Sequence, residues 1–379
     1  MIPYGRQTID EDDIRAVVET LHSDWLTQGP KVAEFEKALA SYCGSSHAVV
    51  FANGTVALHA AYCAAGLKDG DEILTTPLTF AATANAALWL GAKPVFADVD
   101  PLTGNLDVHR AETLITQKTR VLAPVDYAGR PVELDSFLTL ARQKKLVLVE
   151  DACHALGASF KGKKVGAWAD MTVFSFHPVK SITTGEGGAV LTNNASLAEK
   201  LSSFRTHGVT RRHPDWRYDI GELGYNGRLT DMQCALGTSQ LKKLDSFVAR
   251  RSEIADRYQR DLAGIEELAL PPSAQAGGSA WHLFPIRVRT RAQGPDRSQV
   301  FASLRANGIG VQVHYIPVHR HPLYRKLGYP ENLCPNAERF YEEEISLPIY
   351  PTLSEQDQKT VVRELKKALA QRTCEAKTS

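Results

Sequence analysis

The sequence lacks the features that mark several large classes of protein. No apolar run approaches the roughly 20 residues that a membrane-spanning helix needs, and the longest candidate, from Ala81 to Gly91, contains Asn85. The first residues, MIPYGRQTIDEDD, are polar and acidic, unlike the apolar core of a secretory signal. The formal net charge is only +1, whereas nucleic acids and acidic membranes attract clustered basic residues. We therefore expect no nucleic acid and no membrane among the partners.

Cysteine patterns are also missing. The six cysteines have no paired spacing, and neither a C-x-x-C motif nor a zinc-type combination of cysteine and histidine occurs. Reduced thiols in a cytoplasmic protein are the simplest explanation, and we expect no metal site. Internal repeats and low-complexity segments are absent as well, so the chain has the composition of an ordinary globular protein.

Short apolar runs alternate with helical patterns through the first half of the chain. The runs rich in β-type residues are 47–51, 71–75, 93–96, 120–125, 146–149, 171–176 and 189–192. Strands that alternate with helices in this way predict an α/β fold with a mostly parallel sheet. Ligands of such sheets bind beyond the carboxyl ends of the strands.

A smaller unit follows a long helical pattern over residues 232–262. Pro271-Pro272 and Gly277-Gly278 indicate a linker, and the patterns after it are those of an α+β unit. Its expected strands are 281–289 and 311–315, and its expected helices are 298–307, 338–345 and 354–370. Because 379 residues exceed what one core usually supports, we predict a large domain, residues 1–247, and a small C-terminal domain, residues 248–379.

Two turns at strand ends have residues that suit a bound ligand. Asn53-Gly54-Thr55 opens a helix, so backbone N–H groups, the helix dipole and the Thr55 hydroxyl could hold a phosphate. An ordinary turn with an Asn or Thr cap explains the same residues. Asp151 ends a buried strand, where a carboxylate needs a partner such as the protonated pyridine nitrogen of pyridoxal phosphate. Asp151 could instead cap the next helix, and His154 could be a ligand contact or a surface histidine.

The stretch 171–193, MTVFSFHPVKSITTGEGGAVLTN, combines two expected strands with one lysine and a glycine-rich turn. A lysine that forms an imine must be held in place, as Lys180 would be here, and glycines let backbone pass close to a ligand. A β-hairpin with an exposed lysine explains this stretch equally well. Taken with Phe80, which could stack on an aromatic ring, these features predict a cofactor with a phosphate, a basic ring nitrogen and an aldehyde.

The chain resembles the nucleotide-sugar aminotransferases, pyridoxal-phosphate enzymes of fold type I, along nearly its whole length. The resemblance is carried by LTQGP (26–30), FANGTVALHAA (51–61), TFAATANA (79–86), GAKPVFADVDP (91–101), VEDACHALGA (149–158), FSFHPVKSITTGEGG (174–188), HGV (207–209), LGYNGRLTDMQCALG (223–237) and HYIPVH (314–319). It implies an aspartate-aminotransferase-like large domain, a smaller C-terminal α+β domain, and a homodimer with shared active sites.

The resemblance also implies roles for individual residues. Lys180 binds the aldehyde of pyridoxal 5'-phosphate and moves a proton between cofactor and sugar, and Asp151 keeps the pyridine nitrogen protonated. The other implied cofactor contacts are Gly54, Thr55 and Ser175 at the phosphate or ring hydroxyl, Phe80 and His154 at the ring faces, and Asn226, which reaches across a dimer interface to the partner's phosphate. The glycine-rich turn 185–188 then lets backbone pass beneath the cofactor.

Two residues depart from the family pattern, and one discriminates within the family. His154 stands where many relatives have glutamine, and Gly227 where an aromatic residue is common, so their contacts could differ. Relatives that dehydrate sugars have histidine in place of Lys180, so the lysine implies transamination. His177 is either a proton shuttle or substrate contact, or a loop histidine bonded to backbone.

The implied reaction has two halves: L-glutamate gives its amino group to the cofactor, and a keto-sugar nucleotide accepts it. The segments SDWLTQGP, FSFHPVKSITTGEGG and QVHYIPVH, with PLY after the last, resemble the branch that makes UDP-4-amino-4,6-dideoxy-N-acetyl-β-L-altrosamine, a pseudaminic acid precursor. Arg228, His314 and Tyr315 are candidates for holding the UDP-sugar. An acidic partner for Arg228 and strand packing for His314 and Tyr315 are the alternatives.

Three other interpretations stay open. The acceptor could be another nucleotide-linked keto-sugar, used for O-antigen, capsule or an antibiotic. A different fold-type I enzyme, such as a cysteine desulfurase, usually needs an arginine for the substrate carboxylate or an activated loop cysteine, and nothing around Cys334 suggests activation. A catalytically silent protein that only binds the cofactor is disfavoured by the presence of both Lys180 and Asp151.

Overall fold

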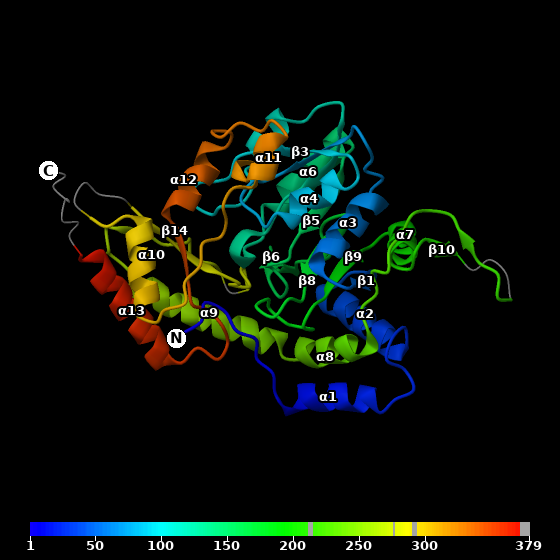
Figure 1. The fold of residues 1–379 in the computed structure, drawn as a ribbon, viewed down its shortest axis with the longest axis horizontal. Coiled ribbons are helices and arrows are strands. Elements are labelled where there is room, and N and C mark those ends of the chain that lie inside the picture. The colour runs from blue at the N-terminus through cyan, green and yellow to red at the C-terminus, as the bar shows by residue number, and fades with distance from the viewer. Residues whose placement is uncertain (211–214, 276, 290–293, 372–379) are drawn as a thin grey trace.

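A seven-stranded sheet with the order β1-β9-β8-β5-β4-β2-β3 lies at the centre of the larger unit (Figure 1). The computed structural model describes residues 1–210, 215–275, 277–289 and 294–371. The strands of this sheet are β1 (His47–Phe51), β2 (Glu72–Thr75), β3 (Lys93–Phe96), β4 (Thr119–Ala123), β5 (Val147–Asp151), β8 (Met171–Ser175) and β9 (Gly188–Thr192). Because β9 alone runs against its neighbours, the predicted α/β fold with a mostly parallel sheet is confirmed.

Helices cover both faces of the sheet, since the central strands are apolar on both sides. The core of one face includes residues of α2 (Pro30–Cys43), α5 (Val108–Thr113), α6 (Leu134–Lys144) and α8 (Asp231–Leu241). The other face packs against α3 (Gly54–Ala64), α4 (Ala82–Leu88) and α7 (Ala195–Arg205). Alanines on the buried side of α3 let this helix lie close to the strands. Outside these layers, α1 (Glu11–Leu21) packs along α8.

The C-terminal unit has its own antiparallel sheet of β12 (Leu268–Ala269), β13 (Phe284–Val288) and β14 (Glu344–Leu347). Its core includes residues of α9 (Leu244–Asp261), α10 (Arg297–Ala306) and α13 (Glu355–Leu369), and Ile2 packs against it. The predicted boundary between residues 247 and 248 falls inside α9. The first residues of α9 pack in the core of the large sheet and the later ones in the C-terminal core, so the division stays a prediction.

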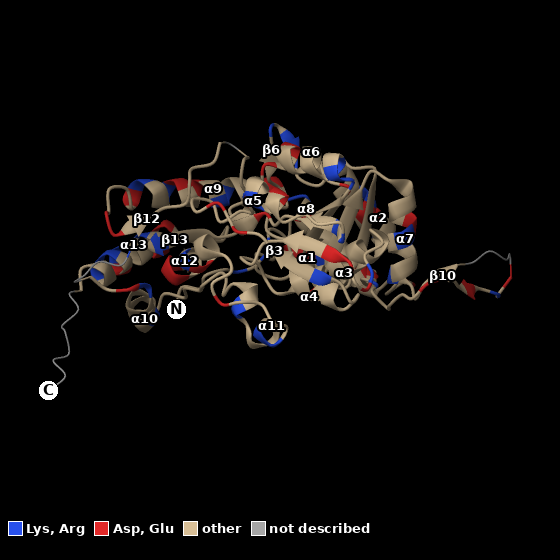
Figure 2. Ribbon diagram, turned by 90° about the horizontal axis from the view of Figure 1, so that it is seen from above, with Lys and Arg blue, Asp and Glu red and all other residues tan. Residues whose placement is uncertain are grey.

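Shorter elements connect these layers. The segments η2 (Val318–Arg320), α11 (Pro322–Lys326) and α12 (Pro335–Glu343) contribute to a fourth apolar cluster, together with η1 (Tyr127–Gly129) and residues near β2 and β3. Two small ribbons pair β6 (Ser159–Phe160) with β7 (Lys163–Lys164) and β10 (Val209–Thr210) with β11 (Asp219–Ile220). Acidic and basic side chains are interspersed over the helices, in keeping with the net charge of +1 (Figure 2).

Three sequence predictions for the second half of the chain are wrong in detail. The expected helix 338–345 ends at Glu343, and the next four residues form β14, because their side chains are buried where they pair with β13. The expected strand 311–315 makes only an isolated bridge, from Gln312 to Ser346. The long helical pattern 232–262 is two helices, α8 and α9, separated at Lys242 and Lys243.

Gly188, the first residue of β9, packs against the turn that opens α3. A Cβ atom on Gly188 would lie 2.7 Å from the carbonyl carbon and oxygen of Asn53 and 2.8 Å from the nitrogen of Gly54. Backbone atoms on both sides leave no room for such a contact, so only glycine fits. The glycine-rich turn 185–188 therefore packs, through Gly188, against the Asn53-Gly54 turn that is the predicted phosphate site. The prediction that its backbone passes beneath a cofactor remains a prediction.

Replacing Gly188 tests this packing. Gly188→Ala should push β9 away from the Asn53-Gly54 turn and lower the free energy of unfolding by about 1–3 kcal/mol, the usual cost of overpacking. Gly221→Ala is the matched control, because a Cβ there meets nothing within 4 Å, and its effect should stay within about 0.5 kcal/mol. Urea unfolding measures both, and equal stability of the two variants would contradict the crowding at Gly188.

Candidate active site

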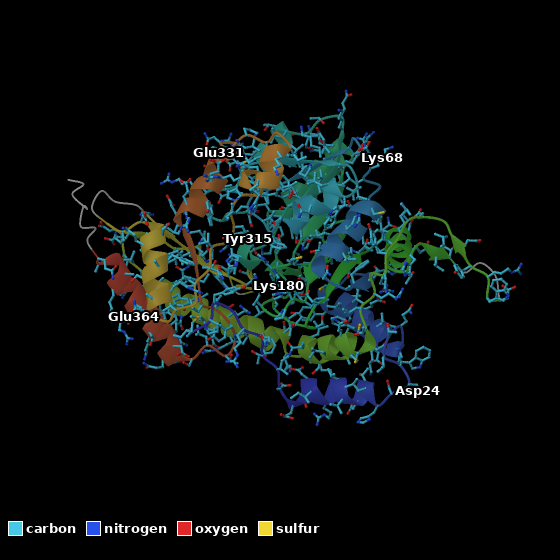
Figure 3. All side chains as sticks on the ribbon, viewed as in Figure 1. Asp24, Lys68, Lys180, Tyr315, Glu331 and Glu364 are labelled. Carbon is cyan, nitrogen blue, oxygen red and sulfur yellow. The ribbon has the colours of Figure 1, made fainter. Side chains whose placement is uncertain are left out.

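A cavity of about 1060 Å³ lies where loops of the large sheet meet the segment around His314 and Tyr315. Among the described residues it is lined by every predicted site residue except Arg228: Gly54, Thr55, Phe80, Asp151, His154, Ser175, His177, Lys180, Asn226, His314 and Tyr315. The labelled side chains of Lys180 and Tyr315 lie near the middle of the molecule, between the two units (Figure 3). Residues up to 311 positions apart in the chain therefore meet in one place, since Tyr4 and Tyr315 share this cavity.

One end of the cavity is formed by the start of α3. The first N–H groups of a helix have no partner inside it. The Asn53 side chain accepts a hydrogen bond only from the backbone N–H of Val56, at 2.9 Å. The N–H groups of Gly54 and Thr55 thus remain for an anion at the positive end of the helix dipole. A Cβ on Gly54 would lie 3.0 Å from that of Ser175, so the glycine lets the Ser175 side chain approach this turn. Asn53 can therefore cap the helix while the N–H groups of Gly54 and Thr55 bind an anion, so both predictions for this turn can hold together.

The Asp151 carboxylate lies at the carboxyl end of β5 and is only 4% exposed. Its Oδ2 accepts a hydrogen bond of 2.7 Å from the Thr83 hydroxyl, and its Oδ1 one of 3.3 Å from the backbone N–H of Cys153. The Thr83 hydroxyl is also 2.9 Å from that of Thr79. Asp151 takes part in none of the ion pairs of the described chain, so its buried charge is held by neutral donors and is suited to a cationic ligand.

Lys180 lies between β8 and β9, and its side chain reaches the same cavity as Asp151. Its backbone N–H donates to the carbonyl of His177 at 2.9 Å, which closes a turn and fixes where the side chain starts. Burial lowers the pKa of the Lys180 ammonium, while Cys153 and Asp151 oppose that shift. A lowered pKa raises the share of neutral amine, which is the nucleophilic form.

Two neutral imidazoles, those of His154 and His282, also line the cavity. His154 Nε2 is 3.1 Å from the Tyr315 hydroxyl, and the His154 ring is 4.2 Å from that of His282. Burial, with the nearby Lys180, lowers the pKa of both histidines well below the usual value. Both Nδ1 atoms are buried and have no hydrogen-bond partner among the described residues. His282 lies beside the expected linker, and no sequence motif identified it.

Aromatic side chains make up part of the cavity lining. Phe80 is 62% exposed, and its ring centre is 6.3 Å from that of Tyr315. His59 contacts Trp89 and Tyr225, with ring centres 5.6 and 5.4 Å away. Large exposed aromatics around a hollow are suited to stacking on flat ligands. His59 and Trp89 lie in helical patterns that predict only packing, and so the sequence did not identify them as cavity residues.

The irregular segment 215–231 runs from a protruding hairpin back to the cavity. The β10–β11 hairpin extends from the body of the protein (Figure 1). Asn226 lines the cavity of its own chain, so the prediction that it serves a partner subunit stays a prediction. A Cβ on Gly227 would lie 3.0 Å from a methyl carbon of Val56, so Val56 would have to shift to admit a larger residue, and the Gly227 carbonyl accepts the Ala52 N–H at 2.8 Å.

Behind Asp151 lies a second buried acid. Glu150 accepts a hydrogen bond of 2.8 Å from the Thr172 hydroxyl and lies beside the buried carboxyl group of Asp126. Burial raises the pKa of Glu150 to about 7, and the hydrogen bond from Thr172 and the neighbouring Asp126 carboxyl oppose this shift. Burial and Glu150 raise the pKa of Asp126 as well. The two carboxyl groups can share a proton, so that one of them stays neutral.

Known proteins resemble this chain along almost its whole length. The model of the DegT/DnrJ/EryC1/StrS aminotransferase family matches residues 7–366. The chain is 44% identical over 364 residues to the UDP-4-amino-4,6-dideoxy-N-acetyl-beta-L-altrosamine transaminase of Campylobacter jejuni, covering 95% of this chain and 96% of that protein.

Solved structures agree with this likeness. Helicobacter pylori PseC, an aminotransferase involved in the biosynthesis of pseudoaminic acid, matches with a TM-score of 0.92 and 37% identity over 97% of this chain and 99% of that one. The PLP-form of Spr1654 from Streptococcus pneumoniae matches with a TM-score of 0.91 and 32% identity over 97% and 98%. None of the described helices is long and apolar enough to cross a membrane.

The buried Glu150 should make stability depend on pH. The pKa of Glu150 rises from 4.5 in the unfolded chain to about 7 in the folded protein. The contribution of Glu150 to the free energy of unfolding is therefore fully present below pH 4.5 and is lost as the pH rises through 7. Glu150→Gln removes this loss and should reduce the fall in unfolding free energy between about pH 5 and pH 8 by on the order of 1–3 kcal/mol. Urea unfolding at both pH values measures this, with the exposed Glu19→Gln as control. An unchanged pH dependence in Glu150→Gln would contradict the assignment.

Proposed function

Because the chain belongs to the DegT/DnrJ/EryC1/StrS aminotransferase family, we propose that it transfers the amino group of L-glutamate to C4 of a UDP-linked 4-keto-6-deoxy-N-acetylhexosamine. The product would be UDP-4-amino-4,6-dideoxy-N-acetyl-β-L-altrosamine, a precursor of pseudaminic acid. The observation that carries this proposal is the meeting of Lys180, Asp151 and the α3 turn in one cavity, in a chain 44% identical to the named transaminase of Campylobacter jejuni.

The residues of the cavity fit pyridoxal 5'-phosphate, the cofactor of this family. Gly54, Thr55 and Ser175 would hold the phosphate at the start of α3, and Asp151 would face the ring nitrogen. The exposed ring of Phe80 is available to cover one face of the cofactor. When bound, the cofactor acts as an electron sink for the bonds at the amino-bearing carbon.

Each of these residues has a defined task in the transfer. The lowered pKa of Lys180 favours an amine that attaches the cofactor and then takes up and returns a proton at Nζ. Thr83 orients the Asp151 carboxylate through its 2.7 Å hydrogen bond, and Asp151 would keep the ring nitrogen protonated. His154, neutral because its pKa is lowered, adds no positive charge that would compete with that proton.

The size and lining of the cavity support a large substrate. A volume of about 1060 Å³ is at the upper end of ordinary ligand sites, so it has room for a cofactor and part of a nucleotide sugar. His314 and Tyr315 lie on the C-terminal side of this space and are proposed to contact the sugar. Arg228 does not line it within one chain, so a contact with the UDP-sugar would have to come from another subunit.

We further infer a homodimer in the cytoplasm, in which the segment 215–231 contributes to the partner's site. The protruding hairpin and the loop after it expose large apolar side chains, with Trp216 at 83% and Leu223 at 91%. Such a patch on a projecting element is suited to covering by a second copy. The described cysteines are free, which suits a reducing compartment.

The two half-reactions can be separated by absorbance. L-Glutamate should bleach the visible band of the bound cofactor, and the UDP-4-keto-6-deoxy sugar should restore it. A panel of nucleotide-linked 3- and 4-keto sugars identifies the acceptor, and recovery with a different sugar only would overturn the substrate assignment. Lys180→Ala should lower transfer by at least about 10²–10⁴-fold, and a Lys180→Ala enzyme that transfers at the normal rate would overturn the proposed role of the lysine.

Mixing two inactive variants tests whether Asn226 serves the partner's site. A mixed dimer of Lys180→Ala and Asn226→Ala chains has one intact site if Asn226 crosses the interface, and none if each chain supplies its own asparagine. Activity should therefore return on mixing. Subunit exchange is verified separately with differently tagged chains. Exchange without any return of activity would contradict the shared site.

A further inference from the structure

Three side chains next to the cavity form an unbroken chain of hydrogen bonds. Nδ1 of His314 is 2.8 Å from the Ser346 hydroxyl, and this hydroxyl is 2.5 Å from Oε1 of Glu344. The other oxygen of Glu344 accepts the backbone N–H of His314 at 2.7 Å. All three residues are buried, with Glu344 and Ser346 on β14, and His314 lines the cavity that contains Lys180.

The hydrogen bonds of this series can run in only two directions, because the single hydroxyl proton of Ser346 can be donated either to Glu344 or to His314. When Glu344 is ionised, Ser346 donates to the carboxylate and accepts the proton on Nδ1 of His314, which leaves Nε2 bare. When Glu344 is protonated, it donates to Ser346, which donates to Nδ1, and Nε2 carries the proton. The protonation of Glu344 therefore sets the tautomer that His314 presents to the cavity.

The surroundings keep the histidine neutral in both states. Burial and the nearby Lys180 lower the pKa of His314 to about 3. Burial raises the pKa of Glu344 to about 8, against the opposing hydrogen bonds and the Arg297 charge. The other titratable groups next to this cluster include Arg287, which lies opposite Glu344 on β13, Tyr127, whose hydroxyl donates to the His314 carbonyl at 2.6 Å, and the rings of Tyr4 and Tyr315. Burial raises the pKa of all three tyrosines, so they stay neutral.

We propose that His314, Ser346 and Glu344 are a proton relay, through which Nε2 of His314 takes up a proton in the cavity while its ring stays neutral. As Nε2 gains this proton, Nδ1 passes its own to Ser346, and Ser346 passes its own to Glu344. The reverse movement returns the proton. The ammonium group of the amino donor is the source that the proposed function supplies, since this group must lose a proton before its nitrogen can attack. Ser346 and Glu344 are positioning residues in this relay, because they act through His314.

The tautomer can be read directly by nitrogen-15 spectroscopy of the histidine-labelled holoenzyme, without any substrate. The Nε2 signal, assigned by its loss in His314→Gln, should change from the protonated to the unprotonated type as pH rises through the ionisation of Glu344. Nδ1 should change in the opposite sense. A signal that does not change with pH, or one that shows both nitrogens protonated, would overturn the relay.

Two variants and a control separate the relay from a general structural effect. Glu344→Gln can only donate to Ser346, because its carbonyl is needed by the His314 N–H, so Nε2 should stay protonated at every pH. Ser346→Ala should abolish the response of His314 to pH, and it keeps the test available if Glu344→Gln does not fold. Glu343→Gln, whose native carboxylate pairs with Arg339 at 2.8 Å, should leave the response unchanged.

The spectroscopic result does not depend on the identity of the substrate. A normal tautomer change in an enzyme that fails to react with any keto-sugar would overturn the proposed function and support the relay. Normal transfer of amino groups with a fixed His314 tautomer would support the proposed function and overturn the relay. A pH response that survives unchanged in both Glu344→Gln and Ser346→Ala would show that these residues do not control His314.

Discussion

The buried carboxylate of Asp151 is the constraint on which the rest of the active site depends. Its oxygens receive hydrogen bonds from Thr83 and Cys153, and no described side chain forms an ion pair with it. Neutral donors offset only part of the cost of burying a charge. Lys180 interacts with Asp151 electrostatically, but under the proposed function this amine would attach the cofactor and would no longer be a free ammonium. The protonated ring nitrogen of pyridoxal 5'-phosphate would then be the cation that the carboxylate needs.

The scaffold serves this arrangement by bringing three strand ends to one edge. β5 ends at Asp151, β8 ends at Ser175, and β1 leads into the turn at Gly54. β9 returns antiparallel between β8 and β1, so the segment with Lys180 must cross this edge to reach it. Glycines at 54 and 188 keep the layers close enough for these ends to form one cavity. Fold and site therefore depend on the same close approaches.

Local patterns in the sequence predicted the parts of the site that lie on regular α/β units. Strand, turn and helix signals placed Gly54 and Asp151 at strand ends, and these residues do share a cavity with Lys180. Thr83 and His282 could not be identified, because their roles depend on contacts with Asp151 and His154, which are distant in the chain. Glu344 was expected in a helix because the local sequence favours one. The pairing of β14 with β13 overrides this local preference and makes it part of a strand. For the same reason the relay to His314 was invisible in the sequence.

The ring nitrogen of the bound cofactor gives the most direct test of this account. Enzyme loaded with pyridoxal 5'-phosphate labelled with nitrogen-15 in the ring can be observed in the wild type and in Asp151→Asn. We predict a protonated ring nitrogen in the wild type over the working pH range and an unprotonated one in Asp151→Asn. An unprotonated ring nitrogen in the wild-type enzyme would contradict the central role given to the buried carboxylate.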